Sequence, residues 1–200
     1  PRRTLLAVIG EGFRYAIGSV AVRTIMFRAF TFTLAGSAAW ALMPLVAADL
    51  LGQGAMVYGL LLGALGLGAV IGAASSTWVR NRFSSEAIIR AAGIIYGGSC
   101  LGVVSGLLVI AGAGWVQALS GFSVAGQIWS PRAIVGRITA MVSSLTFGGI
   151  ALGSWLWGHI AEAHGVAFAV GASGAAMIVL PVIGLLLPMP QHEAQIEGEA

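Results

Sequence analysis

A long segment without a charged side chain, Met56–Val79, most constrains what this chain can fold into. The hydrocarbon core of a bilayer is about 30 Å thick, and about 20 apolar helical residues cross it. The chain contains six long apolar stretches, of which the first also carries Arg28 near its start. They are about Thr24–Ala48, Met56–Val79, two within Ile88–Ser130, Ile138–Ala161 and Val166–Leu187. We therefore expect an all-α membrane protein with six transmembrane helices.

The charge content agrees with a membrane protein and excludes most soluble classes. Only 8% of the residues are charged, against about 25% in soluble domains. The ten basic residues are all arginines and the formal net charge is +3, which we interpret as orientation signals in a bilayer rather than a nucleic-acid surface. The single cysteine, Cys100, excludes a disulfide framework. No signal peptide is recognisable after Pro1, so we expect a piece of a longer protein.

The arginines predict the topology, because basic loops of membrane proteins stay in the cytoplasm. Arg80 and Arg82 precede the stretch Ile88–Ser130, and Arg132 and Arg137 follow it. Two crossings, joined by a tight turn around Ser105–Gly112, return the chain to the same side. We therefore expect both termini to be cytoplasmic and the outer connections to carry no arginine.

Two segments flank the six spans. Leu5–Ser19 has Leu5, Ile9 and Phe13 on one helical face and Arg14 on another, which indicates an amphipathic helix at the membrane surface. The tail 191–200 is polar and acidic. We expect a cytoplasmic linker over 1–22, a six-helix transmembrane domain over 23–190 and a cytoplasmic tail over 191–200.

Glycine pairs predict close contact between these helices. Lipid supplies no hydrophobic drive for helix association, so small residues that permit close backbone approach become important. Pairs four residues apart are Gly59 and Gly63, Gly68 and Gly72, Gly93 and Gly97, Gly98 and Gly102, Gly102 and Gly106, and Gly149 and Gly153. Together they indicate a tightly packed bundle.

Several stretches resemble a known transporter family. They are EGFRYAIGSVAVRTIMFRAFTF, ALMPLVAADLLGQGAMVYGLLLGALGLGAVIGA, WSPRAIVGRITA and FGGIALGSWLWGHIAEAHG. Together they are similar to the C-terminal half of major facilitator superfamily exporters, in the branch of the enterobactin exporter and the transmembrane secretion effectors. This resemblance implies helices seven to twelve of a twelve-helix bundle, with an N-terminal six-helix half as partner and alternating access as mechanism.

The resemblance also implies a cytoplasmic gate and a substrate cavity. The gate candidates are Arg80, Arg82, Arg132, Gly136 and Arg137, although Asn81 stands where the family usually has an acid. The cavity candidates are Trp40, Gln117, Gln127, Trp155 and Trp157. For the two glutamines, hydrogen bonding between helices is an equal alternative. Trp78, Trp129 and, as a weaker candidate, Trp115 fit the aromatic belt at the membrane interface.

Ionisable groups within spans are costly and mark candidate functional sites. Arg28 lies near the start of the first span, where its side chain can extend to the interface. His159 and Glu162 are neighbours on one helical face and are candidates for proton binding, or they simply end a helix in water. No carboxylate is expected in the middle of a span, so the resemblance places the main coupling acid in the partner half.

The resemblance implies efflux of a drug, siderophore or lipophilic metabolite through a bacterial inner membrane, and we expect this efflux to be coupled to proton antiport. Alternatives are a six-helix protein that homodimerises to form the transporter, and an intramembrane protease. The second lacks support, because Ser154 and His159 lie on one helix without a G-x-S-G motif. We expect no enzyme activity, no cofactor and no metal site, and we expect the lipid bilayer and a small-molecule substrate as further partners.

Overall fold

The computed structural model describes residues 5–52, 54–101 and 105–186, and these are helical apart from short connections. No strand occurs in these ranges. The helices are α1 (Leu5–Gly18), α2 (Val20–Leu45), the π-helix η1 (Val46–Leu50), α3 (Ala55–Arg82), α4 (Ser85–Leu101), α5 (Ser105–Ile128), α6 (Val135–His164) and α7 (Val166–Leu186). The all-α prediction is confirmed for the described residues. The tail 191–200 lies outside them.

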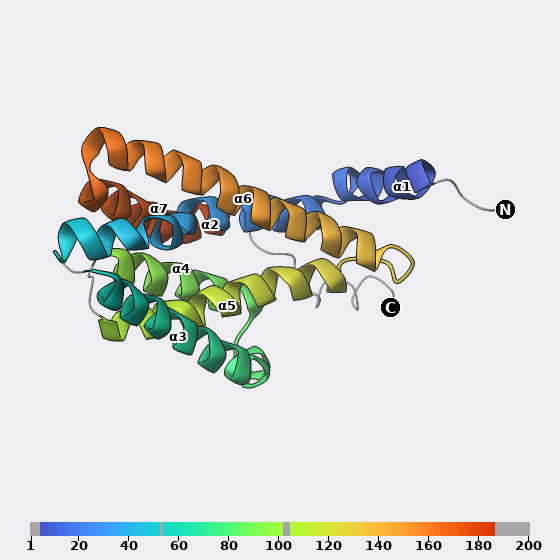
Figure 1. The fold of residues 1–200 in the computed structure, drawn as a ribbon. Coiled ribbons are helices and arrows are strands. Elements are labelled where there is room, and N and C mark those ends of the chain that lie inside the picture. The colour runs from blue at the N-terminus through green and yellow to red at the C-terminus, as the bar shows by residue number, and fades with distance from the viewer. Residues whose placement is uncertain (1–4, 53, 102–104, 187–200) are drawn as a thin grey trace.

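Helices α2 to α7 run side by side along a common bundle axis, and successive helices are antiparallel (Figure 1). The α3–α4 and α5–α6 connections, α1 and the end of α7 lie at one end of the bundle. The α2–α3 and α6–α7 connections lie at the opposite end. Arg82, the last residue of α3, and Arg132, in the α5–α6 connection, are therefore at the same end, which we call the arginine end.

Four helical segments in the described part of the chain are long and apolar enough to cross a membrane. They are Val20–Leu50, Ala55–Arg82, Leu108–Ile128 and Val135–His164. The other two bundle helices are not among these four segments: α4 has 17 residues, and α7 has 21, of which Val166–Leu180 is assigned as a shorter apolar helix. The predicted count of six spans is therefore not confirmed, although six helices run along the bundle.

The turn predicted around Ser105–Gly112 is wrong. Residues 105–112 form the first turns of α5, and Gly112 packs inside the bundle against Leu65 and Ala69 of α3. Glycine is unfavourable in the interior of a helix in water. In an apolar bundle the same glycine instead permits close helix contact.

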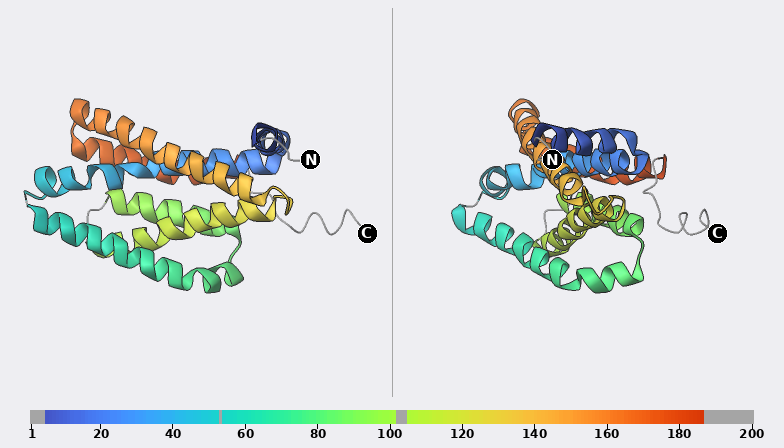
Figure 2. Two further views of the ribbon diagram at one scale, coloured as in Figure 1. Left: turned by 45° about the vertical axis from the view of Figure 1, so that its right-hand side comes forward. Right: turned by 90° about the vertical axis from the view of Figure 1, so that its right-hand side faces the viewer.

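The helix expected over Leu5–Ser19 is present as α1. In the left view of Figure 2, α1 is seen end-on while the long helices are seen from the side. It therefore lies across the bundle axis, at the arginine end. Ser19 ends this helix and begins α2, because its side-chain Oγ accepts a hydrogen bond from the Val22 backbone N–H (3.4 Å).

The long helices pack in a repeated pattern. Helix α2 packs most extensively against α6, and α3 packs most extensively against α5. Helices α2, α3 and α4 correspond in order to α5, α6 and α7. Under this correspondence, the contact between α2 and α6 is equivalent to the contact between α5 and α3. The bundle therefore contains two three-helix units with equivalent contacts.

Glycine pairs lie at both of these equivalent contacts. Gly68 and Gly72 of α3 face the α5 backbone at Val109 and Ala113, and a Cβ added at Gly72 would lie 2.7 Å from the Ala113 carbonyl oxygen. Gly149 and Gly153 of α6 similarly face the α2 backbone at Phe30 and Leu34. The prediction of close packing is confirmed for these two pairs.

The other predicted glycine pairs differ. A Cβ at Gly59 or Gly63 would meet no atom within 4 Å, so this pair makes no close contact. Gly97 packs against the Gly174 carbonyl group of α7, whereas Gly98 faces open space. Gly102 lies outside the described residues. Spacing alone did not reveal which pairs face a neighbouring helix.

Candidate functional site

A buried ion pair joins α2 and α4 near the arginine end. Arg28 of α2 donates two hydrogen bonds to Glu86 of α4, from Nη1 to Oε2 (2.6 Å) and from Nη2 to Oε1 (3.0 Å). Both side chains are about nine-tenths buried, with 9% and 10% of their surface exposed. Such a paired, two-pronged geometry lets an arginine and a carboxylate remain charged in a dry interior. The interpretation that Arg28 extends to the interface is therefore wrong.

Glu86 also accepts a hydrogen bond from Arg90 one helical turn later, from Nε to Oε1 (2.7 Å). Its place in the first turn of α4 is electrostatically favourable, because the positive end of the helix dipole attracts a carboxylate. Glu86 is not among the candidate residues predicted from the sequence. The available signal was the Glu86 and Arg90 spacing of four, which is typical of an ion pair within a helix.

A second contact fastens α1 to the α5–α6 connection. Arg137 donates from Nη1 to Oε2 of Glu11 (3.1 Å), and the Tyr15 hydroxyl donates to the Trp129 carbonyl oxygen (3.0 Å). Gly12 allows this approach, because a Cβ there would lie 3.2 Å from the Arg137 Cβ. The amphipathic helix is thus joined to the loop that carries the predicted gate.

The remaining gate candidates are distributed over the same end. Arg80 donates to Ser120 Oγ of α5 (2.7 Å) and to Ser76 Oγ (3.2 Å), so it links α3 to α5. The Arg82 guanidinium lies over the Trp78 ring at 5.8 Å, and Trp78 is exposed. Arg132 and Gly136 are exposed. The structure therefore brings Arg137 into an ion pair with Glu11 and leaves Arg132 on the surface.

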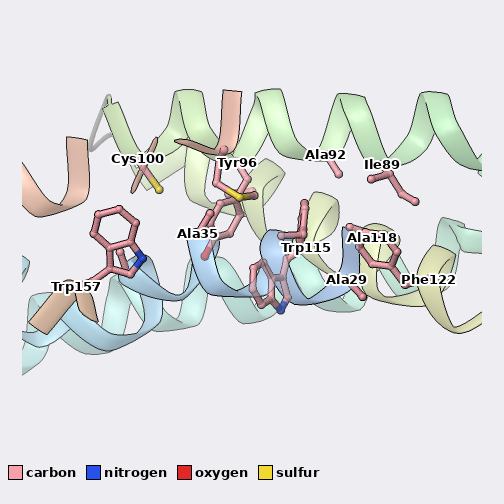
Figure 3. Packing of buried hydrophobic residues seen from close by; sticks show 14 of the residues in the cluster. Ala29, Ala35, Ile89, Ala92, Tyr96, Cys100, Trp115, Ala118, Phe122 and Trp157 are labelled. Atoms are coloured by element: carbon pink, nitrogen blue, oxygen red, sulfur yellow. The ribbon is translucent and has the colours of Figure 1, made fainter. Parts of the chain in front are cut away.

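An aromatic cluster occupies the core between α2, α4 and α5 (Figure 3). The Trp115 ring lies 5.4 Å from Phe32, 5.1 Å from Tyr96 and 6.3 Å from Trp40, measured between ring centroids. The Tyr96 hydroxyl donates to the Gly36 carbonyl oxygen (2.9 Å). Trp115 is buried, so its assignment to the interface belt is wrong.

The cavity candidates are not gathered in one place. Gln117 is buried, and its Nε2 donates to the Gly72 carbonyl oxygen (3.1 Å) and to Ser75 Oγ (3.3 Å), which links α5 to α3. Its Oε1 is buried without a hydrogen-bond partner among the described residues. Trp157 is also buried, and its Nε1 donates to the Leu34 carbonyl oxygen (2.9 Å). Both side chains therefore hold helices together.

The other three candidates are exposed. Trp40 is 38% exposed at the edge of the aromatic cluster. Trp155 is 71% exposed and stacks on His159 (6.2 Å between ring centroids), and Gln127 lies exposed near the end of α5. Because no substrate is present, the assignment of all five residues to a cavity stays a prediction.

The proton-linked candidates lie far from the arginine end. His159 Nδ1 is 3.8 Å from Glu162 Oε2 in the last turns of α6, and both side chains are largely exposed. At this distance the pair makes a weak, solvent-screened contact. The role of these two residues in proton binding remains a prediction.

Comparison with known proteins identifies a family. Residues 1–199 match the family model described as transmembrane secretion effector. No curated protein and no solved structure gives a significant match to the chain.

Proposed function

The chain belongs to the transmembrane secretion effector family, a family of multi-pass membrane transporters, and from this premise we propose that it is the C-terminal half of a two-half exporter. The exporter moves a drug, siderophore or lipophilic metabolite out of the cell by alternating access. We place it in the bacterial inner membrane with the arginine end in the cytoplasm, as the positive-inside rule requires.

The uncovered faces of α3 and α6 carry this proposal. Only 22% of the apolar stretch of each is buried inside the bundle, whereas α2 and α5 bury 56% and 50%. Large side chains such as Met56 (81% exposed) and Phe147 (70%) lie on these two helices. A six-helix half needs such surfaces, because a second half and lipid must cover them.

The repeated packing supports alternating access. Transporters of this superfamily are built from three-helix repeats, and substrate sites lie at the interfaces between repeats. The equivalence of the α2–α6 contact and the α3–α5 contact is consistent with two three-helix repeats. Both contacts join one three-helix unit to the other through glycine pairs against backbone, so we expect the six-helix bundle to move as one rigid body during alternating access.

We propose proton coupling, with the main coupling carboxylate in the partner half. Of the four described carboxylates of this chain, Asp49, Glu86 and Glu162 lie near helix ends, and Glu11 lies within α1, outside the bundle helices. Glu11 and Glu86 are already paired with arginines. His159 and Glu162 remain the local candidates for a secondary proton site.

A homodimer of the chain is the second candidate. The same uncovered faces of α3 and α6 favour it, because two copies could cover each other as two halves would. The two-half exporter needs a separate N-terminal half for transport, whereas the homodimer needs only this chain. One assay can therefore distinguish the two candidates.

We would measure efflux of preloaded ethidium and of a catecholate siderophore from exporter-deficient cells. The cells express this chain alone, or together with an N-terminal six-helix half from the same family as a separate polypeptide. We expect efflux only with both halves, and we expect a protonophore to abolish it because the driving force is the proton gradient.

Efflux by the chain alone, with a dimer seen in crosslinking, would support the homodimer.

A Gln117→Leu variant tests the assignment of Gln117 to the substrate cavity. We expect it to keep the melting temperature within a few degrees, because an interhelical hydrogen bond contributes only about 0.6 kcal/mol, and to lose efflux of at least one probe. A variant that exports every probe normally would remove Gln117 from the cavity.

A further inference from the structure

An apolar groove lies where α1 crosses α2 and α6. Its volume is about 280 Å³. The apolar walls are formed by Phe13, Ile17, Met26, Phe30, Met141 and Leu145. The consecutive helices α1 and α2 thus form one open slot together with α6, which is distant in sequence.

The groove lies at the level expected for the membrane boundary. Helix α1 lies across the bundle axis at the arginine end (Figure 2), as an amphipathic helix does at the surface of a bilayer. Phe13 and Ile17 of α1 are 57% and 55% exposed, although both line the groove. These apolar side chains face lipid in a membrane, so the groove opens toward acyl chains.

One cation lies at the edge of this groove. Arg23 belongs to its lining, is exposed, and donates from Nη1 to the Ile17 carbonyl oxygen at the limit of hydrogen-bond distance (3.5 Å). Arg28, Arg90 and Arg137 each pair with a glutamate. Within the described ranges, no acid forms an ion pair with Arg23. The groove therefore combines an apolar slot with a cation that lacks an internal counter-charge.

We infer that this groove binds one anionic phospholipid, with an acyl chain in the slot and the phosphate group on Arg23. The charge pattern matches this ligand, because basic pockets between helices on the cytoplasmic side recognise anionic headgroups. Arginine suits the phosphate, since its guanidinium presents several donors in one plane. The bound lipid would fill the space between α1 and the bundle and fix the position of α1 relative to α6.

Native mass spectrometry of the purified chain tests this inference. The protein in detergent is mixed with phosphatidylglycerol or phosphatidylcholine of the same acyl chains. We expect one phosphatidylglycerol to be retained more strongly than phosphatidylcholine. Arg23→Gln should weaken its retention about fivefold, the effect expected for one basic residue at a membrane surface, and Arg23→Lys should restore most of it.

Two further variants separate the headgroup contact from the slot. Arg14→Gln is the matched control. Arg14 is also an exposed arginine, but it lies on α1 and lines a different pocket, beside Pro131. We expect it to retain phosphatidylglycerol like the wild type. Met141→Trp fills the slot and should lower retention while Arg23 is intact.

The inference would be overturned by equal retention of both lipids, by undiminished retention in Arg23→Gln, or by an equal loss in Arg14→Gln. A circular-dichroism melt of each variant shows that it is folded. Because the readout is lipid retention rather than efflux, its outcome is independent of the proposed transport function.

Discussion

Glu86 accepts hydrogen bonds from two arginines that differ in burial, and this difference decides their contributions to stability. Arg28 has 9% of its side chain exposed and Arg90 has 32%. Removal of one member of a buried ion pair leaves an uncompensated charge in a low-dielectric interior, which costs about 3–5 kcal/mol. A partly exposed pair within one helix contributes less than about 1 kcal/mol.

We therefore predict that Glu86→Gln lowers the melting temperature in detergent strongly, because it leaves the Arg28 guanidinium buried beside a neutral amide. Arg90→Gln is the matched control and should have a small effect, since the Arg28 pair remains. The measurement is thermal unfolding followed by circular dichroism. Equal melting temperatures for the two variants would show that the buried pair contributes no more than the exposed one.

At the scale of helices, the contact between α2 and α6 depends on the absence of side chains on one face of α6. Gly149 and Gly153 lie directly against the α2 backbone. Gly158, on the same helix, has no neighbour within 4 Å of an added Cβ. The same substitution at two positions of one helix can therefore have opposite effects.

We predict that Gly153→Leu destabilises the bundle by at least about 1–3 kcal/mol, the usual cost of overpacking, because its Cβ would overlap the Leu34 carbonyl group and Ser37. Gly158→Leu should be neutral or slightly stabilising, because leucine favours helix more than glycine does. Detergent thermostability of the two variants gives the comparison. A wild-type melting temperature for Gly153→Leu would mean that α6 does not pack closely on α2.

At the scale of the whole molecule, the fold separates its connections into two groups. Ala133 lies exposed in the α5–α6 connection at the arginine end, and Ala163 lies exposed near the α6–α7 connection at the opposite end. The positive-inside rule assigns the first to the cytoplasm and the second to the outside. The structure shows that the two connections lie at opposite ends of the bundle. The positions of the arginines predict which end faces the cytoplasm.

We predict that a membrane-impermeant maleimide labels Ala163→Cys in intact cells and labels Ala133→Cys only after permeabilisation. Both cysteines are introduced in a Cys100→Ser background, because Cys100 is the natural thiol. The measurement is the fraction of protein labelled with and without permeabilisation. Labelling of Ala133→Cys in intact cells would reverse the orientation that we propose.

The sequence by itself determined the helical class and the approximate helix positions, because long apolar stretches in a chain with 8% charged residues leave few alternatives to helix. It also placed the basic loops at one end, since an even number of antiparallel helices separates Arg82 from Arg132. The helical structure of residues 105–112 was not predicted. A glycine-rich segment can form a turn or a closely packed helix, and the sequence does not show whether a neighbouring helix packs on it.

Only the tertiary structure decided which side chains meet. Arg28 and Glu86 are distant in sequence and pair because α4 packs beside α2 near the arginine end. Gln117 donates hydrogen bonds to α3, and the glycine pairs at 68 and 149 lie against backbone whereas the pair at 59 does not. The physical reason is that lipid solvates every apolar face alike, so apolar periodicity alone carries little information about which face of a helix is buried.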